Sequence, residues 1–159
     1  MRLLVVSDTH GDADALRRLV ERQRQTVAGV IHLGDGCREA AGLETAFPGL
    51  PVWGVRGNCD WGAIADEWPL TRLLTVGGYR IFCTHGQAYA VKYGLTRLAL
   101  AAAEQQADLV LFGHTHQPFT AYEDQTHFLN PGSLGQGYPR TWGWVDLLPG
   151  GIVTRVVEA

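Results

Sequence analysis

Six short motifs with metal-binding side chains occur along the chain, each directly after an apolar run or in a turn. They are Asp8-Thr9-His10, Gly34-Asp35, Gly57-Asn58-Cys59-Asp60, His85-Gly86, Gly113-His114-Thr115-His116 and Asn130-Pro131-Gly132-Ser133. A hydrophobic core does not need Asp, Asn and His at the ends of its strands. A hydrolytic site with two metal ions does, because it needs oxygen and imidazole ligands that converge from several strand ends.

The candidate ligands form two sets of four that share Asp35, whose carboxylate has two oxygens with which to bridge two ions. The first set is Asp8, His10, Asp35 and His116, and the second is Asp35, Asn58, His85 and His114. Mixed oxygen and nitrogen ligands suit Mn, Fe, Ni, Co or Zn better than Mg or Ca. Two such ions about 3.5–4 Å apart can share a hydroxide and stabilise both oxygens of an in-line displacement at phosphorus. Asp35, Asn58 and His85 are therefore also the candidate catalytic residues.

Each motif alone has an ordinary explanation. Gly34-Asp35 is typical of a turn, and His85 could belong to a helix cap. All the motifs together, in order and at strand ends, favour a functional site. Arg56, just before the Asn58 loop, could bind a phosphate oxygen bidentately or be a surface arginine. Together with Asn58 and Cys59 it is a candidate substrate-binding residue.

Two further residues near these motifs have a structural and a functional interpretation. Trp61 directly follows the Asn58 loop, where it could line the rim of a pocket or simply pack against the core. His32 lies inside an apolar strand, which predicts a core histidine or one that supports the site from behind.

Apolar patterns in the first half predict the elements that position these motifs. Residues 2–7, 29–33 and 51–55 read as buried strands, and each ends at one of the motifs. Asp12 can cap a helix after the first strand, and a shorter helix is expected over 37–46. This βαβαβ order implies parallel strands with right-handed crossovers. The loops after such strands form the usual ligand crevice, so distant motifs can meet there.

The second half is richer in strands and hairpins. Strands are predicted over 70–76, 79–84, 108–112, 117–122, 126–130, 142–148 and 152–157, with one helix near 94–106. Gly77-Gly78 and two other short turns join pairs of these strands. The chain has no repeat and no linker, so we expect one domain over 1–159, of the α/β class, with two mixed sheets face to face and helices outside.

Composition excludes several function classes. The net charge of -3 argues against a general nucleic-acid binder. The apolar run at the N-terminus is too short for a signal peptide or a membrane span. The three cysteines, Cys37, Cys59 and Cys83, are odd in number and lack a CxxC spacing. They predict reduced thiols in a cytoplasmic protein.

The motif set resembles the calcineurin-like metallophosphoesterase superfamily, over nearly the whole chain from Asp8 to Ser133. The Asn-Cys-Asp version of the third motif and the Asn-Pro-Gly-Ser segment look most like its compact bacterial and archaeal phosphodiesterase branch, the YfcE-like group. The retromer scaffold subunit has a related fold. The resemblance implies a four-layer α-β-β-α sandwich and hydrolysis of phosphate esters at two metal ions, often stimulated by manganese or nickel. Position by position, it implies the same two ligand sets.

Cys59 departs from the broad superfamily pattern. Many members place a histidine directly after the motif Asn, where it acts as general acid toward the leaving oxygen. A thiol with a pKa near ~8.5 is a poorer proton donor. Every ligand position is filled, so the departure affects leaving-group protonation and not the metal site, and the group that protonates the leaving oxygen stays open.

Three functions follow as hypotheses. The first is a phosphodiesterase in which a hydroxide bridging two ions, manganese above all, attacks the phosphorus of a small phosphate ester. The second is a scaffold of the same fold with feeble or no catalysis. The third is a monoesterase acting on a small phosphorylated metabolite. A pure scaffold has no need of a complete ligand set, which favours an enzyme. No membrane partner is expected, and a homo-oligomer is left open.

Overall fold

The computed structural model describes all residues, 1–159, and its first half alternates strands with helices. The elements are β1 (Arg2–Val6), α1 (Ala13–Gln23), β2 (Gly29–His32), α2 (Cys37–Ala46), β3 (Val52–Gly54) and the short α3 (Ala63–Asp66). The strands β1, β2 and β3 pair in parallel, as the βαβαβ pattern predicts. Asp12 caps α1, because its side chain accepts a hydrogen bond from the Ala15 amide at 3.0 Å.

The second half contains seven strands. They are β4 (Thr71–Val76), β5 (Tyr79–Thr84), β6 (Leu109–Leu111), β7 (Pro118–Glu123), β8 (Thr126–Pro131), β9 (Thr141–Leu148) and β10 (Gly151–Glu158). Between β5 and β6 lie two 3₁₀ turns, η1 (Gln87–Tyr89) and η2 (Val91–Tyr93), and the helix α4 (Thr96–Glu104). One sheet has the order β10-β9-β1-β2-β3 and the other β4-β5-β6-β8-β7, and both mix parallel with antiparallel pairs.

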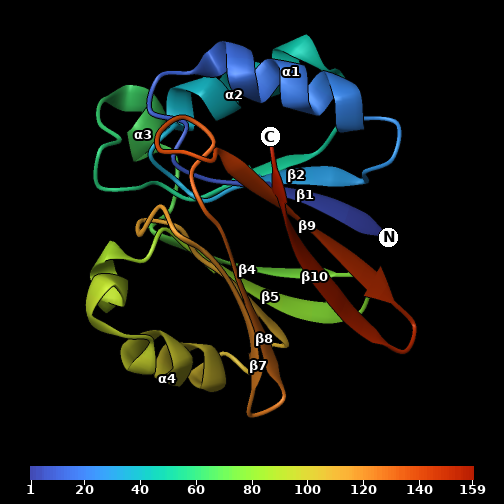
Figure 1. Ribbon diagram of the computed structural model, residues 1–159, viewed down its shortest axis with the longest axis vertical. Helices are drawn as coiled ribbons and strands as arrows, with labels where there is room; N and C mark the ends of the chain where they lie inside the picture. The colour runs from blue at the N-terminus through green and yellow to red at the C-terminus, as the bar shows by residue number, and fades with distance from the viewer.

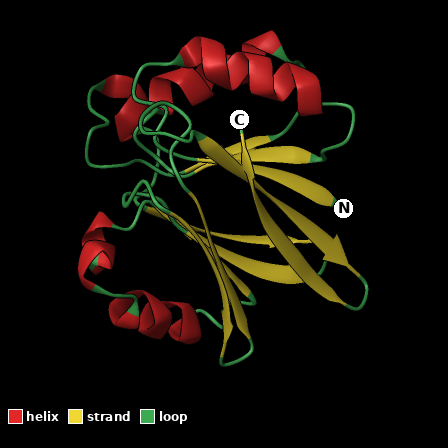
Figure 2. Cartoon of the chain, viewed as in Figure 1, coloured by secondary structure: helices red, strands yellow, loops and turns green.

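The two sheets face each other with helices on both outer sides (Figure 1). The apolar side chains of β1 alternate between two cores: Leu3 and Val5 lie between the sheets, whereas Leu4 and Val6 pack against α1. A third core joins α4 to the second sheet and includes Leu98. The expected four-layer α-β-β-α sandwich of two mixed sheets is therefore confirmed. Loops from both sheets gather at one end of the sandwich (Figure 2).

Most element boundaries lie within two residues of those expected, and the helix over 37–46 matches α2. The sequence missed α3, η1 and η2, each only three or four residues long and too short for a helical period. The turn between β7 and β8 is tighter than expected, because Glu123 pairs within the hairpin and only Asp124 and Gln125 form the turn. Both turn residues have positive φ, as the primed turns of two-residue hairpins require. None of the helices combines the length and apolar character needed to cross a membrane.

Candidate metal centre

The predicted motifs from the two sheets meet at this loop-rich end of the sandwich. Asp8 follows β1, Asp35 follows β2, His85 follows β5 and Gly113 follows β6. Backbone hydrogen bonds join the loops: the Asp8 amide donates to the Gly34 carbonyl and the Gly113 amide to the His85 carbonyl, both at 3.0 Å. These two bonds join the loop after β1 to the loop after β2, and the loop after β6 to the loop after β5.

Asp8 is fully buried, and its two carboxylate oxygens have different partners. Oδ2 accepts hydrogen bonds from the Ser7 hydroxyl and from the His114 backbone amide. Oδ1 has no hydrogen-bond partner and lies 3.1 Å from His116 Nε2, 3.6 Å from His10 Nε2 and 3.9 Å from His85 Nε2. One oxygen is thus held by the protein while the other faces three imidazoles.

Asp35 repeats this arrangement. Its Oδ1 accepts a hydrogen bond from the Cys59 amide at 2.8 Å, and its Oδ2 lies 3.3 Å from His85 Nε2 and 3.8 Å from His10 Nε2. Burial opposes ionisation, but the interactions with His85 and Cys59 outweigh it, so the pKa of Asp35 lies below its usual value. The residue is therefore a carboxylate near neutral pH, with a single oxygen turned toward the imidazoles.

His85 presents an unpartnered nitrogen to both carboxylates. Its Nδ1 donates to the Leu33 carbonyl at 2.7 Å, which leaves the buried Nε2 without a hydrogen-bond partner. Burial acts against protonation, but the nearby Asp35 and Asp8 carboxylates raise its pKa. The two carboxylates therefore create a potential that attracts positive charge at this point.

The remaining imidazoles lie beside the same carboxylates. His10 Nε2 and His116 Nε2 are 3.1 Å apart, and the His114 ring centroid lies 5.0 Å from that of His85. Burial lowers the pKa of His114, with a smaller contribution from neighbouring His85, so its imidazole is neutral near pH 7 and can offer a lone pair.

The donor atoms fit divalent cations. Two triplets each have all ligand atoms within 4.8 Å of one another: Asp8 with His10 and His116, and Asp8 with Asp35 and His85. Buried polar atoms without a partner are rare and costly, yet Asp8 Oδ1 and His85 Nε2 both belong to these triplets. A cation between these atoms would satisfy both. The chain therefore contains a metal-ligand cluster.

Five of the candidate ligands have a left-handed backbone, with φ between 45° and 66°: Asp8, His10, Asp35, His114 and His116. Non-glycine residues rarely adopt this conformation, and it costs about 1–3 kcal/mol per residue. The adjoining glycines serve close packing, since a Cβ on Gly57 would lie 2.1 Å from Asp35 Oδ1. Such strain concentrated on one cluster is typical of functional sites.

The side chains of Asn58 and Arg56 do not point at the cluster but have other partners. Asn58 is exposed, and its amide donates to Cys59 Sγ at 3.4 Å rather than to His85 or His114. Arg56 pairs with Asp66 on the surface, with 3.2 Å between Nη1 and Oδ1. Cys59 Sγ is brought close: it lies within 4.8 Å of donor atoms of His10 and Asp35.

Asp60 organises the loops that carry Asp35 and Cys59, a role that its motif alone did not indicate. Its Oδ2 accepts hydrogen bonds from the Asp35 and Gly57 amides, and its Oδ1 from the Gly36 and Cys37 amides, at 2.7–2.9 Å. Gly36 and Cys37 begin α2, so this distant carboxylate caps the helix N-terminus. Burial opposes its ionisation, but these bonds lower its pKa.

Replacing Asp60 with asparagine should destabilise the fold. The amide group of Asn would face two N–H donors, so about 3 kcal/mol of unfolding free energy should be lost. Urea denaturation measures this loss. Asp66→Asn is the matched control, because Asp66 forms only an exposed ion pair with Arg56 and should change stability by less than about 1 kcal/mol. Equal stability of the two variants would show that the hydrogen bonds of Asp60 do not stabilise these loops.

Asn130 and Ser133, from the sixth motif, support the cluster from behind. The Asn130 side-chain amide donates to the Gly113 carbonyl at 2.9 Å, and the Ser133 hydroxyl donates to the Asp8 carbonyl at 2.8 Å. His32 has a comparable place: it is fully buried, its Nδ1 accepts from the Gly34 amide, and burial lowers its pKa to about 4. The sequence left open a core histidine or one that supports the site, and the structure shows a buried histidine that is bonded to the Gly34 amide.

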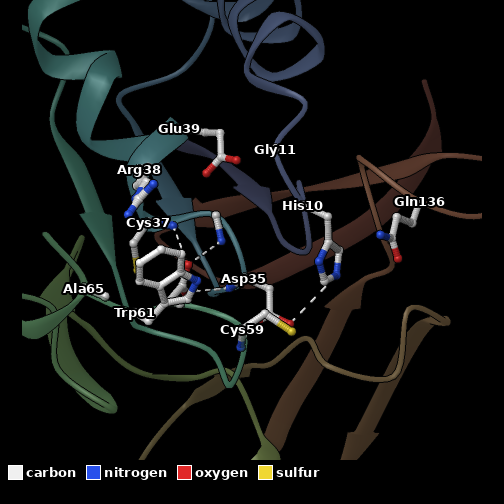
Figure 3. A pocket seen from close by; sticks show the side chains of 12 residues that line it. His10, Gly11, Asp35, Cys37, Arg38, Glu39, Cys59, Trp61, Ala65 and Gln136 are labelled. Carbon is white, nitrogen blue, oxygen red and sulfur yellow. Dashed lines mark hydrogen bonds and ion pairs between the residues drawn. The ribbon is translucent and has the colours of Figure 1, made fainter.

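A pocket of about 360 Å³ opens beside the cluster (Figure 3). His10, Asp35 and Cys59 form part of its lining, together with Trp61 and Arg38 from outside the cluster. Trp61 is 72% exposed, and its place on the pocket agrees with the rim position considered from the sequence. A small molecule in the pocket would touch the cluster and this aromatic ring together.

Comparisons with known proteins agree with this geometry. Residues 1–146 match the model of the calcineurin-like phosphoesterase superfamily domain. The probable metallophosphoesterase YsnB of Bacillus subtilis is 36% identical, over 84% of this chain and 75% of that protein. Phosphodiesterase YfcE of Escherichia coli is 28% identical, over 92% and 88%. Vacuolar protein sorting-associated protein 29 of Schizosaccharomyces pombe is 38% identical, over 84% and 72%.

Solved structures support the same assignment. A predicted phosphoesterase from Streptococcus pneumoniae superposes with a TM-score of 0.74 at 26% identity, over 98% of this chain and 97% of that one. The family model covers the strands and loops that build the metal-ligand cluster. The chain therefore belongs to the calcineurin-like phosphoesterase superfamily.

Proposed function

We propose that this protein is a metal-dependent phosphodiesterase that works with two divalent ions. The observation that carries the proposal is the pair of buried carboxylates, each with one oxygen fixed by backbone amides and the other facing imidazoles. Asp8, His10, Asp35 and His116 would hold one ion, and Asp35, Asn58, His85 and His114 the other. Bound ions supply an activated water and positive charge for displacement at phosphorus.

The protein's own contribution is orientation. Asp60 holds the Asp35 and Gly57 amides, and Leu33 fixes the His85 tautomer, so the donor atoms need little rearrangement to bind ions and substrate. For Asn58 to serve as a ligand, its exposed amide would turn from Cys59 toward the imidazoles. After that turn, the same amide would also contact a non-bridging phosphate oxygen.

The diester preference rests on Cys59 and the pocket. Burial and the nearby Asp35 carboxylate raise the pKa of the Cys59 thiol, which therefore stays neutral and is a weak proton donor near pH 7. A weak donor penalises the basic alkoxide leaving groups of common monoesters. The pocket beside Cys59 offers room for a second ester group. The Escherichia coli relative carries the name phosphodiesterase, which supports this choice.

The monoesterase is the second candidate, and a panel of phosphomonoesters and diesters with the same leaving group separates the two. We expect diesters to react faster at saturating metal. A higher kcat/KM for the monoesters throughout the panel would reverse the assignment.

A scaffold function is the third candidate, since the fission-yeast relative is a vacuolar protein sorting-associated protein. The unpartnered buried donor atoms favour the enzyme, because a scaffold gains nothing from leaving Asp8 Oδ1 and His85 Nε2 without partners. The three free cysteines accord with a reducing compartment, and we propose a cytoplasmic location.

Metal removal tests the proposal most directly. Protein stripped with chelator should be inactive toward bis(p-nitrophenyl) phosphate, and Mn²⁺ should restore activity better than Mg²⁺, because the imidazoles disfavour an ion that prefers oxygen ligands. Mn²⁺ should also raise the melting temperature, since it binds the folded protein only. Equal rescue by both ions at matched concentrations, or no thermal shift with Mn²⁺, would count against the site.

A further inference from the structure

Trp61 and Arg38 form an exposed shelf on the pocket beside the metal-ligand cluster (Figure 3). The Trp61 side chain is 72% exposed, and the Arg38 guanidinium carbon lies 4.6 Å from the centre of its ring. Exposing so large an aromatic surface to water is unfavourable, and nothing in the core requires it. A flat ring beside a reactive centre is a surface on which another planar group can stack.

Three polar side chains around the shelf have no hydrogen-bond or ion-pair partner within the protein. Arg38 has no ion pair, Glu39 forms no side-chain hydrogen bond, and Gln136 bonds only through its backbone amide. By contrast, the Asp60 carboxylate on the same wall is fully engaged by four amides. The side chains of Arg38, Glu39 and Gln136 are therefore free to bind a ligand.

The charged side chains that line the pocket favour some classes of ligand over others. Glu39 can only accept hydrogen bonds, so it favours hydroxyl or amino donors and repels a second phosphate. Arg38 stacks on Trp61 and leaves its edge N–H groups able to meet carbonyl or ring-nitrogen acceptors. A nucleobase with its sugar has this combination of a planar ring, donors and acceptors. The pocket volume of about 360 Å³ is also within the usual size of small-ligand sites.

Resting on the proposed phosphodiesterase function, we infer that the Trp61–Arg38 shelf binds a nucleoside group of the substrate. The substrate class is then a nucleoside phosphodiester, with the phosphate at the metal-ligand cluster and the base stacked on Trp61. Trp61 and Arg38 determine specificity and take no part in the bond-breaking step. His10, Asp35 and Cys59 line the same pocket as Trp61 and Arg38, so a ligand in this pocket can touch the cluster and the shelf together.

The test compares two ligands that differ only by the base. AMP and ribose 5-phosphate are titrated against Mn²⁺-loaded protein by calorimetry. Base–aromatic stacking is worth about 1–3 kcal/mol, so AMP should bind at least about fivefold more tightly to the parent protein. Trp61→Ala should abolish that difference and leave ribose 5-phosphate affinity unchanged, whereas Trp61→Phe, which keeps a ring, should retain most of it. Arg38→Ala should weaken AMP binding alone.

Tyr122→Ala is the matched control, because Tyr122 is 62% exposed on β7 and does not line this pocket. It should keep the full preference for AMP. Equal binding of the two ligands by the parent, or an unchanged ratio in Trp61→Ala, overturns the inference. Hydrolysis of bis(p-nitrophenyl) phosphate is measured on the same samples: if turnover persists without a base preference, only the shelf assignment fails, and if the preference stands without turnover, the proposed function fails.

Discussion

Asp35→Asn is expected to lose nearly all phosphodiester hydrolysis and most bound metal. The substitution keeps the shape of the side chain but removes the charge that faces His85 and His10 at 3.3 and 3.8 Å. Metal ions supply several kcal/mol of transition-state stabilisation, so activity should fall by about 10³-fold or more. Elemental analysis of bound manganese and a steady-state assay measure the two losses.

Asp124→Asn is the control, since Asp124 is an exposed turn residue with positive φ, a conformation that asparagine tolerates. It should match the parent in both measurements. The melting temperature of metal-free Asp35→Asn should fall somewhat below that of the metal-free parent, because the lowered pKa of Asp35 means that its ionised form stabilises the folded state near pH 7. Two equivalents of manganese together with parental turnover in Asp35→Asn would show that the ligand sets are wrongly assigned.

The contacts of the two carboxylates add a second candidate to the predicted bridging role of Asp35, which stays a prediction. From the motifs, Asp35 was the bridging residue because its two oxygens could each reach an ion. In the structure the Cys59 amide occupies Asp35 Oδ1, so only Oδ2 faces the cluster. Asp8 Oδ1 faces His116, His10 and His85, so it also lies between the two sets of imidazoles. Asp8→Asn should therefore impair metal binding about as severely as Asp35→Asn.

The sequence predicts the layers well because its strands carry a strong signal. Strand β1 is apolar on both faces, as a strand between a helix layer and a second sheet must be, and the polar residues Ser7 and Asp8 follow it directly. The ends of such runs point to the loops that meet, so the clustering of Asp8, Asp35 and His85 was predictable. The left-handed backbone conformation of Asp8 and Asp35 could not be predicted, because Asp tolerates positive φ but usually adopts negative φ.

The supporting residues were harder to predict, since their roles depend on contacts between loops far apart in sequence. Nothing local distinguishes Asp60 from a surface aspartate, although it accepts hydrogen bonds from four backbone amides in the structure. Arg38 gave no signal either, because its place over Trp61 depends on how α2 packs beside the loop after β3. Such residues become visible only once the loops are assembled.

Cys59→His is expected to accelerate hydrolysis of esters with poor leaving groups. The Cys59 amide is anchored on Asp35 Oδ1, so the side chain at this position is held within 4.8 Å of the donor atoms of His10 and Asp35. Burial and Asp35 raise the pKa of the native thiol, which makes it a weak acid at neutral pH. An imidazolium at the same place could protonate the departing oxygen.

The size of the gain should depend on the leaving group. A well-placed general acid contributes about 10²–10⁴-fold, and activated aryl esters need little of that help. The parent should therefore hydrolyse aryl phosphodiesters readily and alkyl esters slowly, with a steep dependence of log kcat/KM on leaving-group pKa. Cys59→His should flatten that dependence, raise rates most for alkyl esters, and add a limb to the pH profile near a histidine pKa.

A leaving-group series measured on both proteins decides the matter, with Cys59→Ser as a control of similar size that supplies no better acid. The Asp60 carboxylate is fully used by four amide hydrogen bonds, so it would not orient the new imidazole and the gain should stay toward the lower figure. If the parent shows no dependence on leaving-group pKa, and Cys59→His leaves the slope unchanged, another group already protonates the leaving oxygen. The role given to Cys59 would then be wrong, while the assignment of the metal ligands would stand.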